Sequence, residues 1–128
     1  MTLSILHVDD SEDIREVVRL ALETVGGLNV VQCGSGAEAL EAAQASKIDL
    51  FLLDVMMPEM TGPQTLLGLR ELPQFARTPA VFLTAKAANG DLDELMGLGA
   101  ADVLFKPFDP MTLADQVVAI WERSQADV

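Results

Sequence analysis

From residue 50 to residue 53 the chain reads Leu-Phe-Leu-Leu, and an aspartate, Asp54, follows directly. The run is short, and it is apolar at every position instead of alternating with polar residues. Such a run is typical of a strand that is covered on both faces, as in a parallel sheet with helices on each side. We therefore predict a buried strand of a parallel sheet over Leu50–Leu53.

Four more runs of this kind lie before and after it, and they are Leu3–Val8, Asn29–Cys33, Ala80–Leu83 and Val103–Phe105. The segments between the runs place apolar residues at the spacing of an α-helix. A strand–helix unit repeated five times predicts a doubly wound α/β sandwich with right-handed crossovers.

The expected helices differ in the strength of their signals. The first has a clear apolar stripe before Gly26 and Gly27, made of Ile14, Val17, Val18, Ala21, Leu22 and Val25. The other four are predicted from a capping box of Ser35 with Glu38, from Pro63, from the weak pattern Leu92–Leu98, and from Asp109 as N-cap with Pro110 in the first turn.

Size and composition narrow the class of protein. The 128 residues suit one domain over 1–128, and the single cysteine, Cys33, excludes an internal disulfide and indicates a reducing compartment. No apolar run approaches the ~20 residues of a membrane span, and the first residues do not resemble a signal peptide, so we expect a cytoplasmic protein. The net charge of −12 argues against direct binding of nucleic acid.

Polar residues follow four of the five predicted strands. Asp9 and Asp10 come after the first, Asp54 after the third, Thr84 after the fourth and Lys106 after the fifth. Because ligands of open parallel sheets bind at the carboxyl ends of the strands, we expect these side chains to converge there.

Three carboxylates at one place repel each other unless a cation compensates them. Oxygen ligands without His or Cys favour a hard cation, and Mg²⁺ fits better than zinc. Lys106 and Thr84 would add a positive charge and a hydrogen bond for a phosphoryl group, and Asp54 can act as the nucleophile that receives it.

At these residues the sequence resembles the receiver domain of two-component response regulators. The matching stretches are Ile5–Ser11 (ILHVDDS), Asp49–Gly62 (DLFLLDVMMPEMTG), Pro79–Ala85 (PAVFLTA), and Gly99–Asp102 (GAAD) with Lys106–Phe108 (KPF). They follow the order and spacing of the family over nearly the whole chain. The resemblance implies a flavodoxin-like fold with five strands in the order 2-1-3-4-5 and five helices.

The resemblance also implies roles for single residues. Asp54 would accept the phosphoryl group, and Asp10, Asp54 and the backbone carbonyl of Met56 would bind Mg²⁺ directly, with Asp9 assisting through water. Lys106 would pair with the phosphoryl oxygens, and the Lys106-Pro107 bond would be cis. Thr84 would move to bond the phosphoryl group.

The implied partners are a histidine kinase or histidine phosphotransfer protein and a downstream protein or output domain. The domain would promote its own phosphorylation and dephosphorylation but turn over no external substrate. The face of the fourth helix, fifth strand and fifth helix would be the output surface, where two copies could also pair on phosphorylation. The first helix, with exposed Glu12, Arg15, Glu16 and Arg19, is expected to dock the donor.

One position departs from the family pattern. The residue three before Lys106 is commonly Tyr or Phe, and here it is Val103, so the coupling of Thr84 to a partner surface is expected to be weaker or built differently. Met56 and Lys86, each two residues after a site residue, are expected to flank the path of attacking water and to affect dephosphorylation.

Other interpretations stay open beside this one. The protein could be a pseudo-receiver that takes no phosphate, or an Mg²⁺-dependent phosphohydrolase, although Met56 stands where such enzymes often have a second carboxylate. The acids could be helix N-caps. His7 is interpreted as a partly buried structural histidine, Cys33 as a core residue, Trp121 as an anchor of the last helix, and Gly62 as a backbone requirement of its loop.

Overall fold

Five parallel strands form one sheet in the computed structural model, which describes residues 2–85 and 89–126. The strand order is β2-β1-β3-β4-β5, as the resemblance implied. The strands are β1 (Ser4–Val8), β2 (Asn29–Cys33), β3 (Leu50–Asp54), β4 (Ala80–Thr84) and β5 (Asp102–Phe105). Each lies within one residue of its predicted bounds, and β3 and β4 are buried along their whole length.

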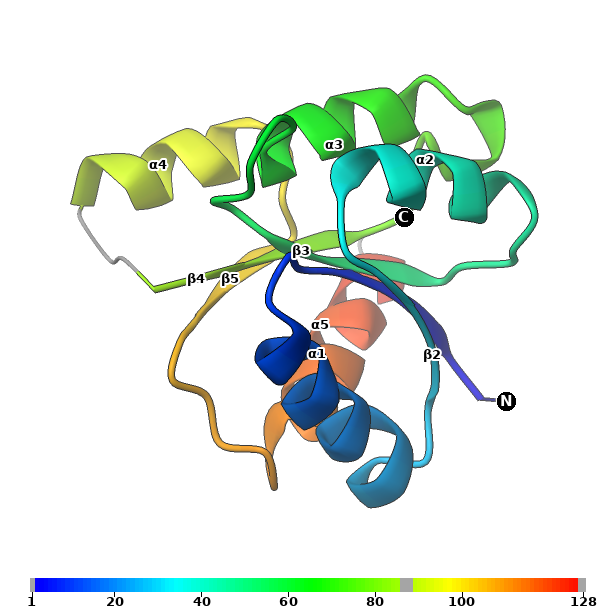
Figure 1. The fold of residues 1–128 in the computed structure, drawn as a ribbon, viewed down its shortest axis with the longest axis vertical. Helices are drawn as coiled ribbons and strands as arrows, with labels where there is room; N and C mark the ends of the chain where they lie inside the picture. Colours follow the sequence, from blue (N-terminus) through cyan, green and yellow to red (C-terminus); the bar gives the residue numbers. More distant parts are fainter. Residues whose placement is uncertain (1, 86–88, 127–128) are drawn as a thin grey trace.

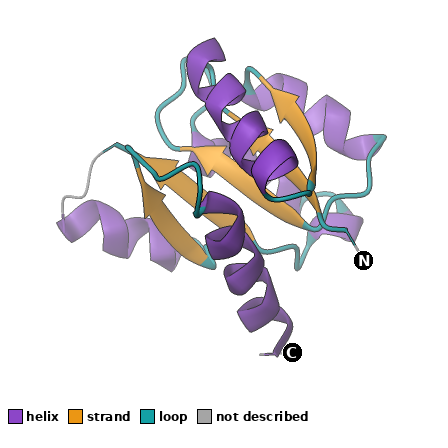
Figure 2. Ribbon diagram, turned by 90° about the horizontal axis from the view of Figure 1, so that it is seen from below, coloured by secondary structure: helices purple, strands orange, loops and turns teal. Residues whose placement is uncertain are grey.

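Helices cover both faces of this sheet (Figures 1 and 2). The helices are α1 (Glu12–Arg19), its π-helical continuation η1 (Leu20–Val25), α2 (Gly36–Gln44), α3 (Gly62–Arg70), the 3₁₀ turn η2 (Pro73–Phe75), α4 (Asn89–Gly97) and α5 (Leu113–Ala126). Figure 1 shows α2, α3 and α4 on one face and α1 and α5 on the other. None of the helices that the structure describes has the length and apolar character needed to span a bilayer.

Two apolar clusters, one on each face, hold the layers together. Strand residues alternate between them: Leu6 and Phe51 pack toward α2 and α3, whereas Ile5 and Leu52 pack toward α1 and α5. Burying a side chain of this size stabilises the fold by ~1.5–3 kcal/mol. Trp121 packs against the second cluster, as predicted for an anchor of α5.

Several helix details differ from the predictions. Val17 and Val25 of the predicted stripe are exposed. Val25 lies in η1, which places more residues in each turn than an α-helix and so rotates the end of the stripe. The weak helix α4 covers Asn89–Gly97 instead of Leu92–Leu98. Regular α5 begins at Leu113, and Asp109 accepts hydrogen bonds from the amides of Met111 and Leu113 in the turn before it.

Capping also differs in part. Ser35 accepts from the amide of Glu38 as predicted, but the Glu38 carboxylate accepts from the amide of Gly34 instead of returning to Ser35. A complete capping box is present at Thr61 and Gln64, and Pro63 lies between them in the first turn of α3.

Candidate phosphoryl-transfer site

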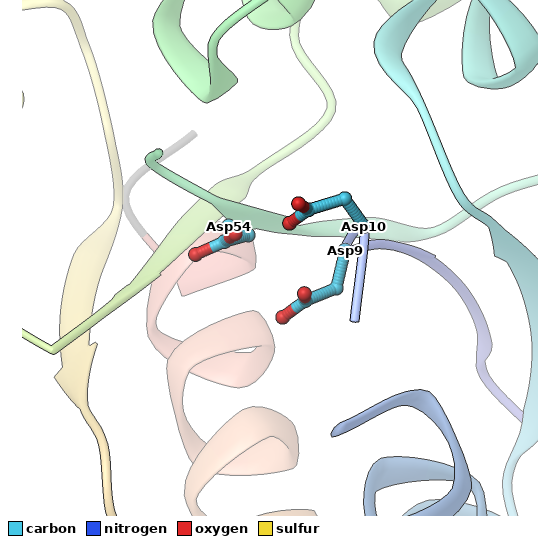
Figure 3. Close-up of side chains that lie close together, drawn as sticks. All are labelled: Asp9, Asp10 and Asp54. Carbon is cyan, nitrogen blue, oxygen red and sulfur yellow. The ribbon is translucent and has the colours of Figure 1, made fainter. Parts of the chain in front are cut away.

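Three carboxylates meet at the carboxyl end of the sheet (Figure 3). Asp9 and Asp10 follow β1, and Asp54 is the last residue of β3. One oxygen from each lies within 4.8 Å of the others. The register explains this convergence, since Val8 pairs with Leu53 and the residues that follow them end at the same level of the sheet.

Lys106 brings its ammonium group to two of these acids. Its Nζ donates to Oδ2 of Asp9 at 3.0 Å and to Oδ1 of Asp54 at 3.1 Å. The lysine follows β5, and its backbone amide donates to the carbonyl of Thr84 at 2.8 Å, which fixes where the side chain begins. The Lys106-Pro107 bond is cis, as predicted.

Burial sets the electrostatics of the site. Asp9 and Asp54 are 1% and 6% exposed, whereas Asp10 faces solvent. Burial, and next the charge of Asp9, raise the pKa of Asp54, although Lys106 opposes them. Desolvation by itself would lower the pKa of Lys106, but its hydrogen bonds and attraction to Asp9 and Asp54 outweigh it and raise that pKa.

The loops around the acids are fixed by short local contacts. Ser11 donates its amide to Oδ1 of Asp9 at 2.9 Å, and its hydroxyl caps α1. Gly62 donates its amide to the carbonyl of Val55 at 2.9 Å, and a Cβ at this position would overlap the carbonyl of Asp54. Gly62 is therefore required for close approach of two backbone segments. This close approach is the backbone requirement that was predicted for its loop from the sequence.

Thr84 and Met56 complete the set of predicted residues. Thr84 is the last residue of β4 and is 6% exposed, next to Phe105 in the sheet register. Met56 lies two residues beyond Asp54 with its side chain 75% exposed. The structure thus brings Asp9, Asp10, Asp54 and Lys106 into direct proximity and ties Thr84 to Lys106 through the backbone, while Lys86 lies outside the described residues.

The contact of Arg15 with the backbone at the acidic site was not predicted from the sequence. We expected Arg15 to be exposed on α1, but it is half-buried, and its guanidinium donates to the backbone carbonyl of Asp9 at 2.7 Å. A side chain that contacts a backbone carbonyl leaves no pattern in the sequence. His7, predicted to be partly buried, is fully buried; burial first, then the charges of Lys106 and Arg15, lower its pKa to about 3.

This arrangement suits one kind of chemistry. Carboxylate oxygens from two strands are the ligands that a hard divalent cation prefers, and a lysine ammonium lies against a buried carboxylate that can act as nucleophile. The donor set of Asp9, Asp10 and Asp54 therefore fits Mg²⁺.

Comparisons with known proteins agree with this geometry. The family model described as "Response regulator receiver domain" matches residues 5–118. The transcriptional regulatory protein CpxR of Escherichia coli K12 is 42% identical over 122 residues, which are 94% of this chain and 50% of CpxR. The alkaline phosphatase synthesis transcriptional regulatory protein PhoP of Bacillus subtilis is 39% identical over 127 residues, 98% of this chain and 51% of PhoP.

A solved structure of a chemotaxis protein also resembles this chain. The chemotaxis protein CheY4 of Vibrio cholerae superimposes with a TM-score of 0.87 at 34% identity, covering 94% of this chain and 99% of CheY4. The chain belongs to the receiver domains of response regulators, which are phosphorylation switches of two-component signalling, and its role is signalling and not metabolic. It spans about half the length of the curated relatives that it matches.

Proposed function

We propose that Asp54 accepts a phosphoryl group from the phosphohistidine of a histidine kinase or histidine phosphotransfer protein. A carboxylate oxygen of Asp54 attacks phosphorus, the N–P bond breaks, and its electron pair returns to the imidazole nitrogen of the donor. The observation that carries the proposal is the contact of Lys106 Nζ with Asp54 at 3.1 Å. This contact lies inside a cluster of three acids whose negative charges exceed the single positive charge of the lysine.

Mg²⁺ is the proposed metal, held by Asp10, Asp54 and the backbone carbonyl of Met56. Asp9 would assist through water, because its two oxygens already accept from Ser11 and Lys106. When bound, Mg²⁺ supplies a fixed double positive charge that offsets the negative charge of the transferring phosphoryl oxygens.

Lys106 and Thr84 are the proposed contacts of the phosphoryl group once it is attached to Asp54. Lys106 would exchange its bond with the Asp54 carboxylate for one with a phosphoryl oxygen, so its charge stays compensated. The Thr84 hydroxyl would donate to another phosphoryl oxygen from the end of β4. Because Val103 is buried and small, the resulting shift in affinity for a partner would use a route other than an aromatic side chain at that position.

The wider setting is also part of the proposal. Residues 1–128 would form one cytoplasmic receiver domain that promotes its own phosphorylation and dephosphorylation and turns over no external substrate. Its output would be a downstream protein or an attached domain, and two copies could pair on phosphorylation. CpxR and PhoP are transcriptional regulatory proteins of about twice this length, so DNA binding by an attached domain is compatible with the proposal, whereas this acidic domain would not contact DNA itself.

Incubation with acetyl phosphate and Mg²⁺, followed by intact mass spectrometry, tests the assignment. We expect a gain of one phosphoryl group that disappears without Mg²⁺ and in Asp54→Asn. Absence of the gain in the wild type would indicate a pseudo-receiver, and a gain that persists in Asp54→Asn would place the acceptor elsewhere.

A further inference from the structure

A polar chain of contacts, buried at His7 and reaching the surface at Arg19, connects the acidic site to α1. His7 in β1 and Gln32 in β2 are register partners, and Gln32 Nε2 lies 3.1 Å from His7 Nδ1. The same Nε2 donates to the backbone carbonyl of Arg15 at 2.7 Å, while Oε1 accepts from Nε of Arg19 at 3.1 Å. Arg15 in turn donates to the carbonyl of Asp9.

The chemistry of the partners fixes the orientation of the Gln32 amide. The Nε of Arg19 can only donate and the carbonyl of Arg15 can only accept, so Oε1 must face Arg19 and Nε2 must face Arg15. The second hydrogen of Nε2 is then directed at His7 Nδ1, which must act as an acceptor. The neutral imidazole therefore carries its proton on Nε2, which has no hydrogen-bond partner among the described residues.

The chain of contacts ends on a peptide group that matters for the site. The carbonyl of Asp9 belongs to the peptide that joins Asp9 to Asp10, so its orientation constrains the backbone from which both side chains begin. The Arg15 guanidinium reaches it by passing over Gly34, where even a Cβ would lie 3.2 Å from the arginine NH1. Gln32 holds the backbone of Arg15 and so limits where that guanidinium can lie.

We propose that Gln32 is a positioning residue for the cation site, which acts through Arg15 on the Asp9–Asp10 peptide and is locked in place by His7 and Arg19. The proposal rests on the function proposed above, in which Asp9 and Asp10 serve Mg²⁺ binding. Gln32 touches neither the metal nor the phosphoryl group, so its loss alters metal affinity and not the chemistry of a loaded site.

The test compares Gln32→Met with Gln44→Met. Both substitutions remove a neutral amide that donates to a helix backbone carbonyl, but Gln44 lies exposed on α2, where its amide donates to the carbonyl of Leu40. We expect Gln32→Met to raise the Mg²⁺ concentration for half-maximal binding about 3- to 10-fold, somewhat less than the loss of a direct partner of a metal ligand. Calorimetric titration measures this change, and Gln44→Met should match the wild type.

A second readout separates positioning from a loss of chemistry. At saturating Mg²⁺ the rate of phosphorylation by acetyl phosphate should be the same in Gln32→Met and wild type. A lower rate at saturation, or an unchanged Mg²⁺ affinity in a folded Gln32→Met protein, would overturn the proposal. A wild-type protein that binds no Mg²⁺ would instead overturn the proposed function together with this consequence of it.

A third measurement needs no variant. His7 is the one histidine of the sequence, so its ring nitrogens give a single set of ¹⁵N signals in an untagged protein. We expect a neutral ring with the proton on Nε2 in the wild type. A proton on Nδ1 would show that Gln32 does not donate to His7, and the proposal would fail even if Gln32→Met did not fold.

Discussion

At the scale of single residues, the site depends on the charge of Lys106. Among the described residues, its ammonium is the one cationic group seen to pair with the carboxylates of Asp9 and Asp54, and both acids are buried. A buried carboxylate that loses its partner pays the cost of desolvation without compensation. We therefore expect the lysine to stabilise the fold, in addition to its proposed role in phosphoryl transfer.

Lys106→Met should lower the free energy of unfolding by about 2 kcal/mol in the absence of divalent cations, because it leaves two acids uncompensated. Urea denaturation at neutral pH measures the difference. Lys47→Met, which removes an exposed lysine, should stay within about 0.5 kcal/mol of the wild type. Equal denaturation midpoints for the two variants would show that Lys106 does not balance the acids.

Asp54 has the opposite effect on stability. Its pKa is raised in the folded state by burial and by Asp9, so the folded protein holds a proton that the unfolded chain releases. Ionised Asp54 thus destabilises the fold above its raised pKa, and this effect vanishes as the pH falls to the ordinary value of 3.8.

Asp54→Asn should consequently raise the stability of the metal-free protein at neutral pH by on the order of 1 kcal/mol, or a few degrees in Tm. The gain should shrink as the pH falls toward 4, which thermal unfolding at several pH values can follow. Asp93→Asn, at an exposed position of α4, is the matched control and should show no such gain. A gain that is constant with pH would rule out this origin.

At the scale of elements, the loop from β3 to α3 depends on Gly62. Gly62→Ala would force its Cβ against the carbonyl of Asp54, so the loop must move at the proposed acceptor residue. We expect the free energy of unfolding to fall by about 1–3 kcal/mol and phosphorylation by acetyl phosphate to be slower.

Gly97→Ala at the end of α4 is the control. Its Cβ would meet no atom within 4 Å, so it should raise the free energy of unfolding by about 0.5 kcal/mol. If both variants phosphorylate like the wild type, the close approach at Gly62 is not needed for the site.

Strands were easier to predict from the sequence than helix ends. Runs such as Leu50–Leu53 are apolar because helices cover both faces, so burial leaves a direct record in the sequence. Thr61 and Gln64 had the spacing of a capping box and could have been recognised. The π turn at Leu20–Val25, which contacts α5, has no local sequence pattern that predicts it.

The residues of the site also fall into those that the sequence predicted and those that it did not. Asp9, Asp54 and Lys106 were predictable because the topology of a parallel sheet places strand ends together. The bonds of Gln32 with His7, Arg15 and Arg19 were not, since they join three elements through one amide and two of its contacts are to a backbone carbonyl and a ring nitrogen.

At the scale of the whole molecule, folding concentrates charge that the unfolded chain keeps apart. The net charge is −12, and the sheet brings three acids from two strands within 4.8 Å of one another. A cation that binds there binds the folded state and not the unfolded chain, so it must stabilise the fold by mass action. General screening by salt also reduces repulsion, but it does not depend on the arrangement of the site.

Mg²⁺ should therefore raise Tm more than NaCl of equal ionic strength, with a stabilisation of about 2.7 kcal/mol when its concentration is 100 times the dissociation constant. Asp10→Asn removes an exposed side chain that is proposed to bind Mg²⁺, without unpairing Lys106, so it should lose the Mg²⁺-specific increment and keep the increment from NaCl. Asp13→Asn, an exposed acid in the first turn of α1, carries the same change in charge and should keep both. Thermal scans of the three proteins separate the two effects.

Two outcomes would contradict this prediction. Equal increments in Tm from the two salts in the wild type would mean that the acids act only through net charge. A Mg²⁺ increment that survives in Asp10→Asn would place the cation elsewhere.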